Sequence, residues 1–213
     1  EVDMPLKEIK LFLNNKTPDE LIELLKGKSL EIQKKINNLN QIQKIIDTKI
    51  ALTENALKLD FKQISLEIQE EELLFLSDSI LDCSDRSFLK SVSHFIDFLY
   101  KNELDIGYPI GAMVNRAKLM EEDYDNYSYL YTKTEADVKN ISFYTKPKGL
   151  YVVAYHVGND KNISKTYKEI MKFIDKHQIK LGSYSYEEYI LDEISVSGSD
   201  NYVTQILVEV EEI

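Results

Sequence analysis

Apolar residues recur along the first part of the chain in steps of three and four. Between residues 29 and 58 they alternate with lysines, asparagines and other polar residues, and no glycine or proline occurs from Ser29 to Ile106. This spacing predicts a long amphipathic helix over 29–58. Its apolar side, here named the seam, consists of Ile32, Ile36, Leu39, Ile46, Ile50 and Leu57, with Gln43 and Thr53 as polar positions within it.

A separate signal marks where helical structure begins. Thr17-Pro18-Asp19-Glu20 offers an N-cap hydroxyl, a proline for the first helical position and a glutamate three residues after the cap. A helix is therefore predicted to start here, and Gly27 is expected to interrupt it.

The seam needs a partner, because an isolated long helix with an exposed apolar stripe is marginally stable in water. A second copy of the chain is the favoured partner, since no other predicted helix nearby is long enough to cover the seam. The alternative is that the seam packs against the second domain of its own chain. We therefore predict a homodimer formed through the helix at 29–58.

After residue 60 the pattern changes to the alternation typical of half-buried strands. The order strand, helix, strand, strand is predicted twice: at 64–68, 84–100, 108–114 and 127–132, and again at 150–157, 164–177, 184–190 and 202–210. An α+β fold follows, in which two pseudo-symmetric βαββ units place their helices on one side of an antiparallel or mixed sheet. The predicted domains are a helical linker and coiled-coil arm over 1–60 and a second domain over 61–213.

Charge is distributed unevenly between these domains. The net charge is −11; residues 1–60 carry ten Lys/Arg and ten Asp/Glu, whereas residues 61–213 carry sixteen and twenty-seven. The acidic second domain should repel nucleic acid and attract organic cations. No apolar run approaches the roughly 18 to 20 residues of a membrane span and no leader is apparent, so we expect a cytoplasmic protein without a membrane partner.

Tyrosines gather on several predicted strands, where alternate residues share a face. The sets are Tyr127, Tyr129 and Tyr131, then Tyr151 and Tyr155, then Tyr184 and Tyr186. Ordinary cross-strand packing explains many of them. In Tyr186-Glu187-Glu188-Tyr189, only one glutamate is expected to face the domain interior, where tyrosine hydroxyls, a proton or a bound cation would have to satisfy it. A solvent-facing glutamate pair is the alternative.

Signals for catalysis are weak. His94, His156 and His177 are far apart without ligand spacing, the single Cys83 lies in no protease signature, and no glycine-rich phosphate loop occurs. We therefore predict no metal, no cofactor and no catalytic residue. A glutamate beside tyrosines could still act as a general acid or base, which leaves hydrolysis open.

Six segments of the chain are distinctive in combination: Met4-Pro5-Leu6-Lys7-Glu8-Ile9-Lys10, Tyr127-Ser128-Tyr129-Leu130-Tyr131, Lys146-Pro147-Lys148-Gly149-Leu150-Tyr151, Ala154-Tyr155-His156, Tyr186-Glu187-Glu188-Tyr189 and Tyr202-Val203-Thr204-Gln205-Ile206. Together they resemble the MerR family of transcription activators, in particular the region after the winged helix-turn-helix and the GyrI-like effector-binding domain. The resemblance covers essentially the whole chain.

The resemblance implies a central pocket for lipophilic cations, an antiparallel helical dimer and promoter DNA bending by the full-length protein. It places the pocket carboxylate at Glu187 and the aromatic wall at Tyr127 and Tyr202, with Tyr108 near a further lining position. A wall position on the first domain helix, aromatic in some relatives, falls near Phe88 or Leu89. Further candidate ligand-binding residues are Tyr151, Tyr155 and Tyr189.

These observations predict the ligand-sensing and dimerisation region of a MerR-type regulator. A DNA-binding module of roughly 70 residues is expected to precede it in the full-length protein, so this chain alone should not bind an operator. The alternatives are a GyrI-like hydrolase that uses Glu187 with a tyrosine, and a stand-alone protein that sequesters small molecules. The helix over 29–58 favours the regulator, because neither alternative needs a dimerising arm.

Overall fold

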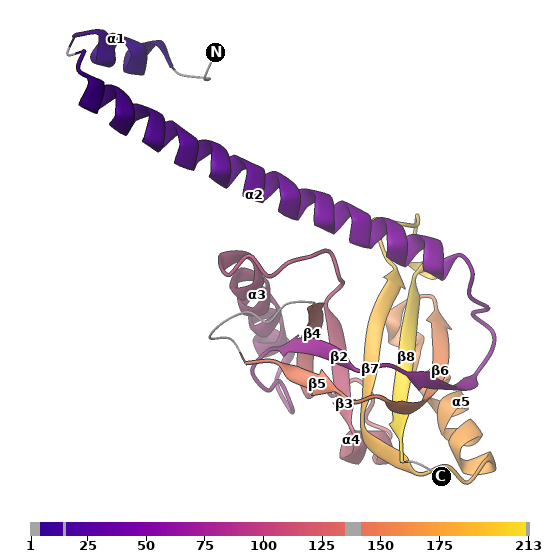
Figure 1. Ribbon diagram of the computed structural model, residues 1–213. Helices are drawn as coiled ribbons and strands as arrows, with labels where there is room; N and C mark the ends of the chain where they lie inside the picture. Colours follow the sequence, from indigo (N-terminus) through magenta and orange to yellow (C-terminus); the bar gives the residue numbers. More distant parts are fainter. Residues whose placement is uncertain (1–4, 15, 135–141, 212–213) are drawn as a thin grey trace. The chain divides into compact units, whose positions relative to one another are not determined.

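The computed structural model describes residues 5–14, 16–134 and 142–211, so Met4 lies outside the described residues. The chain divides into two compact units, residues 1–46 and 47–213. Helix α1 spans Leu6–Asn14 and helix α2 spans Pro18–Ala56 (Figure 1). No helix in the described part of the chain has both the length and the apolar character needed to cross a membrane.

The predicted start of α2 is confirmed. The backbone N–H of Glu20 donates to the Thr17 hydroxyl at 3.2 Å, and Pro18 is the first helical residue. The expected interruption at Gly27 is wrong, because α2 continues through it without a break. A single glycine costs a helix only about 1 kcal/mol, and the leucines, lysines and glutamates around it favour the helix.

The last turns of α2 belong to the second unit. Ala56 is buried in a cluster with Leu191 and Val203, and the Lys49 ammonium lies 3.6 Å from the Asp192 carboxylate. The end of the long helix is therefore fixed to one end of the sheet.

The second unit is built on an eight-stranded sheet with the order β1-β6-β8-β7-β3-β4-β2-β5, in which all paired strands are antiparallel. The strands are β1 (Ser65–Gln69), β2 (Glu72–Leu76), β3 (Gly111–Asn115), β4 (Tyr129–Thr134), β5 (Tyr144–Lys146), β6 (Gly149–Val157), β7 (Leu181–Leu191) and β8 (Val203–Val210). The helices are α3 (Asp85–Lys101), α4 (Arg116–Met120) and α5 (Ile163–Lys176), with 3₁₀ turns at Asp160–Asn162 and Ser199–Asn201.

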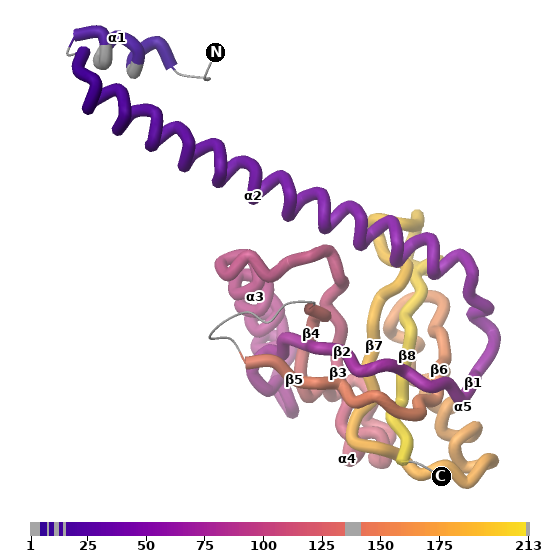
Figure 2. Tube along the Cα trace, in the orientation of Figure 1, coloured from indigo at the N-terminus to yellow at the C-terminus, as the bar shows by residue number. Residues whose placement is uncertain are grey.

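The sheet curls because one two-stranded ribbon forms both of its ends. In this ribbon, β1 and β2 form one strand and β5 and the start of β6 form the other. Ser65 pairs with Val153 in β1 and β6, and Glu72 pairs with Lys146 in β2 and β5, so the register continues from one pair to the next. Figure 2 shows β1 leading directly into β2 and β5 leading toward β6. This ribbon joins the two halves of the sheet.

The α+β class is as predicted, but the first strand of the first unit was assigned incorrectly. The strand at 65–69 pairs with β6 of the second set, whereas β2 pairs with β4 and completes the order β2-α3-β3-β4. Sequence reasoning missed β2, β5 and α4. The set β6-α5-β7-β8 has the predicted order. Pseudo-symmetry between the two sets stays a prediction.

The two faces of the sheet are covered differently. Ala112 and Val114 point to the same face of β3; Ala112 packs with the α3 cluster and Val114 with the α5 cluster, so both helices cover that face. The opposite face carries Met113, Tyr186 and Leu207. The ribbon packs against this second face through Leu74 of β2, Tyr144 of β5 and Tyr151 of β6, all in one cluster with Tyr186.

A buried ion-pair network joins the ribbon to the sheet. The Lys133 ammonium lies 2.7 Å from the Glu188 carboxylate and 3.1 Å from that of Glu72, which also accepts from Lys146 at 2.6 Å. Burial disfavours the charged form of Lys133, but the carboxylates of Glu188 and Glu72 outweigh it and raise the pKa of this lysine. Strands β2, β4, β5 and β7 are thereby held by charged contacts in addition to their backbone hydrogen bonds.

Removing one member of this network should destabilise the fold. Lys133→Met leaves Glu188, whose side chain is 3% exposed, without its cation, and we expect a loss of about 3 kcal/mol in the free energy of unfolding. The matched control is Lys148→Met, because Lys148 and its partner Glu70 are 60% and 75% exposed. That variant should lose less than about 1 kcal/mol. Urea denaturation measures both, and equal losses would contradict the role given to the buried network.

Candidate ligand-binding cavity

A cavity of about 540 Å³ lies on the helix-covered face of the sheet. Its apolar wall comes from α3, β3 and β4, and its polar groups come from β7, β8, the segment before β4 and the 3₁₀ turn before α5. The lining residues are Phe88, Val92, Ile110, Gly111, Ala112, Asp125, Tyr127, Leu130, Asp160, Lys161, Glu187, Tyr189 and Thr204. A methyl group at Gly111 would clash with the Glu187 carbonyl and the Tyr131 ring, so glycine permits this close approach of β3.

Glu187 is the buried carboxylate of this cavity, with 6% of the residue exposed. The Tyr167 hydroxyl donates to one carboxylate oxygen at 2.7 Å, and the Tyr127 hydroxyl donates to the other at 3.1 Å. Burial raises the pKa of Glu187 to about 8; the two tyrosines oppose this shift, and the negative charges of Asp160 and Asp125 add to it. The cavity therefore holds a carboxyl group that can gain or lose its proton near neutral pH.

The neighbouring Glu188 is buried on the other face of β7, so the expectation that one glutamate would be exposed is wrong. Each face of this strand is covered, one by the helices and the other by the ribbon. Glu188 is neutralised by Lys133, whereas the contacts of Glu187 are tyrosine hydroxyls. The two adjacent glutamates are thus satisfied in different ways.

Tyr127 does not share a face with Tyr129 and Tyr131, as the alternation had predicted. Strand β4 begins only at Tyr129, and Tyr127 lies in the preceding segment, where its ring contacts Phe88 at a centroid distance of 6.2 Å. Tyr129 and Tyr131 pack in the cluster on the opposite face. Alternation applies only within a strand, and the strand was taken to start two residues too early.

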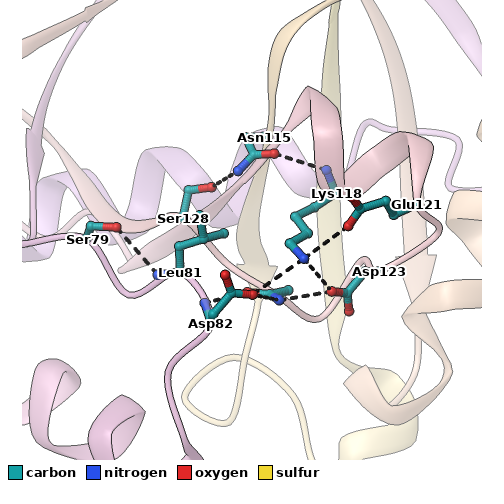
Figure 3. Close-up of polar contacts among 9 residues, drawn as sticks. Ser79, Leu81, Asp82, Asn115, Lys118, Glu121, Asp123 and Ser128 are labelled. Atoms are coloured by element: carbon teal, nitrogen blue, oxygen red, sulfur yellow. Dashed lines mark hydrogen bonds and ion pairs between the residues drawn. The ribbon is translucent and has the colours of Figure 1, made fainter.

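A polar network fixes the segment that carries Tyr127 (Figure 3). The Lys118 ammonium lies within 3.4 Å of the carboxylates of Asp82, Glu121 and Asp123. Asn126 donates to Asp82 at 2.8 Å and to Asp123 at 2.9 Å. These contacts tie residues 121–126 to the turn before α3, and so position Asp125 and Tyr127 at the cavity.

The other candidate residues divide between the cavity and the far face of the sheet. Phe88 and Tyr189 line the cavity, and Tyr189 donates a hydrogen bond to Asp160. Tyr202 is not among the lining residues; its ring meets that of Tyr189 nearly at a right angle, with centroids 6.5 Å apart. The remaining three lie elsewhere: Tyr108 near Lys133, Tyr151 within the ribbon-covered cluster, and Tyr155 beside Phe61.

Sequence reasoning missed Tyr167, which is fully buried, bonds to Glu187 and lies 2.8 Å from the Ser185 hydroxyl. The ring of Tyr124 stacks on it with centroids 4.5 Å apart. The spacing of Ile163, Tyr167 and Ile170 could have shown that Tyr167 faces the sheet. Nothing in the local pattern indicates that its hydroxyl reaches a residue on β7.

Among the described residues, no group of three or more histidines, cysteines, aspartates or glutamates is arranged to hold a metal ion. The cavity instead combines apolar walls, aromatic rings and a single deeply buried carboxylate, which is the chemistry of a small-molecule site.

The family model described as GyrI-like small molecule binding domain matches residues 67–211. The chain belongs to this family. The match starts within β1 and ends just after β8, so the cavity lies wholly inside the GyrI-like domain. A small-molecule binding domain is therefore present, as the resemblance had implied.

One relative of this chain is named as a regulator. The multidrug-efflux transporter 2 regulator of Bacillus subtilis (strain 168) is 43% identical over 213 residues, which cover 100% of this chain and 77% of that protein. At this level of identity and coverage the two chains are homologous over their full aligned length.

Solved structures show the same fold. EcmrR, in a cryo-EM structure of its DNA complex, matches 100% of this chain and 79% of its own with a TM-score of 0.53 and 18% identity. A hydrolase from Listeria innocua matches 74% of this chain and 96% of its own with a TM-score of 0.50 and 14% identity. At such low identity these likenesses concern the fold alone.

The raised pKa of Glu187 predicts a specific pH dependence of stability. In the folded chain Glu187 keeps its proton up to about pH 8, whereas an ordinary glutamate has a pKa of 4.5. The protonated Glu187 therefore contributes its full share to the free energy of unfolding below pH 4.5, and this contribution is lost as the pH rises through 8. Glu187→Gln cannot lose this proton. The difference in melting temperature between the variant and the unchanged protein should therefore increase in favour of the variant from pH 5 to pH 8. It should correspond to a change of about a few kcal/mol in the free energy of unfolding. A difference that does not vary with pH would contradict this prediction.

Proposed function

We propose that this chain is the ligand-sensing and dimerisation region of a MerR-type transcription regulator, and that its cavity binds lipophilic organic cations. The observation that carries the proposal is Glu187, a buried carboxylate among apolar and aromatic walls whose hydrogen-bond partners are two tyrosine hydroxyls. The regulator homologue at 43% identity supports the setting.

The chemistry of the cavity favours a cation with an apolar body. Phe88, Val92 and Leu130 can contact an apolar body, while the rings of Tyr127 and Tyr189 can attract positive charge. Glu187 then supplies the countercharge. A desolvated cation needs such a partner, because an unpaired charge in an apolar site costs several kcal/mol.

Control of promoter DNA is the further step of the proposal. Tyr189 pairs with Thr204 across β7 and β8, and the next pair along these strands, Leu191 and Val203, contacts Ala56 of α2. A ligand that shifts the ends of β7 and β8 would therefore also shift the last turn of α2. Binding could in this way select one arrangement of a dimer and of the DNA-binding modules expected in the full-length protein.

A hydrolase is the weaker candidate. Glu187 with a tyrosine could provide acid–base chemistry, and one structural neighbour is named as a hydrolase, but that likeness concerns only the fold. Sequestration by a stand-alone protein would not need α2. The homology to a regulator extends over all of this chain, α2 included, and favours sensing over both.

Glu187→Gln should greatly weaken cation binding. The change keeps the side-chain shape and removes the charge, so the affinity for a lipophilic cationic dye, measured by calorimetry at pH 8, should fall on the order of thirtyfold or more. A neutral dye of similar shape should be affected far less, because it never forms the ion pair.

The matched control is Glu188→Gln, on the same strand but on the opposite face. Measured at a temperature at which the variant remains folded, it should bind the dye nearly as well as the unchanged protein. A larger loss for Glu188→Gln than for Glu187→Gln, or no loss for either, would refute a cavity centred on Glu187.

The seam on α2 should form the homodimer interface. In the single chain Ile36 is 44% exposed and Ile46 is 53% exposed, so both are available to a second copy. Ile36→Glu combined with Ile46→Glu should convert a dimer into a monomer at micromolar concentration, as measured by light scattering. Asn37→Glu with Asn38→Glu adds the same charge on the polar side and should leave the dimer intact. A mass that is unchanged by the first pair would remove the seam as the interface.

A further inference from the structure

The cavity also carries a positive charge. Among the described lining residues Lys161 is the one basic residue, and it is exposed, which places it at the rim of the cavity. Its backbone is fixed in the 3₁₀ turn Asp160–Asn162, where its N–H donates to the Asn159 side chain at 3.0 Å. No ion pair to Lys161 occurs in the described part of the chain.

The neighbouring Asp160 forms no ion pair with Lys161 among the described contacts. Asp160 accepts a hydrogen bond from the Tyr189 hydroxyl, which engages its carboxylate at the cavity wall. Asp125 is the other exposed acid of the lining. The cavity thus has a negative buried end at Glu187, apolar walls, and a rim where acids stand beside an ammonium group without an ion-pair partner.

We propose that Lys161 is a specificity-determining residue, which favours lipophilic cations that carry an anionic or hydrogen-bond-accepting group at the end remote from their positive centre. This inference rests on the proposed function, because it assumes that the positive centre of the ligand lies near Glu187. The ligand class is therefore amphoteric aromatic molecules rather than simple cations alone.

The physical reason is the separation of the two charges in the site. A simple cation bound at Glu187 gains nothing from Lys161 and is repelled by it, whereas a carboxylate at the outer end of the ligand meets a donor with a positive charge. Because the rim is exposed, the interaction is that of a solvated ion pair. Its effect on affinity should be about two- to fivefold.

A pair of related dyes tests this directly. The ester of a cationic xanthene dye carries one positive charge, and the corresponding free acid is a zwitterion with nearly the same shape. Binding of both is measured by fluorescence anisotropy at pH 8 to the unchanged chain, Lys161→Met and Lys165→Met. Lys165 is an exposed lysine one turn further along, on α5 and outside the cavity lining, so its variant has the same net charge as Lys161→Met.

Lys161→Met should bind the ester about two- to fivefold more tightly and the free acid more weakly by a similar factor, whereas Lys165→Met should leave their ratio unchanged. An unchanged ratio in Lys161→Met, or an equal change in both variants, would overturn the role of Lys161. Glu187→Gln separates this from the proposed function: if the ester binds equally well to that variant, or binds to no form of the chain, the proposed function itself fails.

Discussion

The rest of the structure depends on the covering of β7 on both faces. Successive side chains of a strand point to opposite sides, and here α3 and α5 cover one side while the ribbon of β1, β2, β5 and β6 covers the other. Glu187 and Glu188 are consequently both withdrawn from water, and each must be neutralised or hydrogen-bonded. The two solutions differ, and that difference separates a structural carboxylate from a candidate functional one.

On the ribbon side, the protein's own Lys133 neutralises Glu188. Lys133, Lys146, Glu72 and Glu188 form a network whose members come from four strands, and it closes the curled sheet. On the helix side, tyrosine hydroxyls from α5 and from the segment before β4 meet Glu187. Hydroxyls can satisfy a carboxylate without a countercharge, and the proposed cation site rests on this observation.

The proposed sensing function also draws on the position of the cavity. Its walls include the ends of β7 and β8, and the same strand ends contact the last turns of α2. The segment before Tyr127 is held to the turn before α3 by the contacts of Lys118 with Asp82 and Asp123 (Figure 3). Under the proposed function, a ligand at Glu187 would act on strands whose ends contact the last turns of α2, and a population shift could begin from that contact.

Features specified by neighbouring residues could be predicted from the sequence, whereas features that depend on distant contacts could not. The cap at Thr17, the helix from Asp85, and the strands and helix of the second βαββ set follow from local periodicity, which depends on residues only a few positions apart. Family resemblance added Glu187 and Tyr127 to the candidate site. The strand Glu72–Leu76 was missed because its short apolar run lacks alternation, and Tyr127 was placed on the wrong face because the start of β4 is set by pairing with β3.

Only the tertiary structure decided that Tyr167 meets Glu187, that Tyr151 and Tyr155 face away from the cavity, and that Glu188 is paired with a lysine 55 positions away. These outcomes depend on the order of strands in the sheet, which brings together residues that share no local pattern. By itself the sequence determined most of the helices and longer strands and the chemical groups available. Burial on both sides of one strand determined which of those groups form the site.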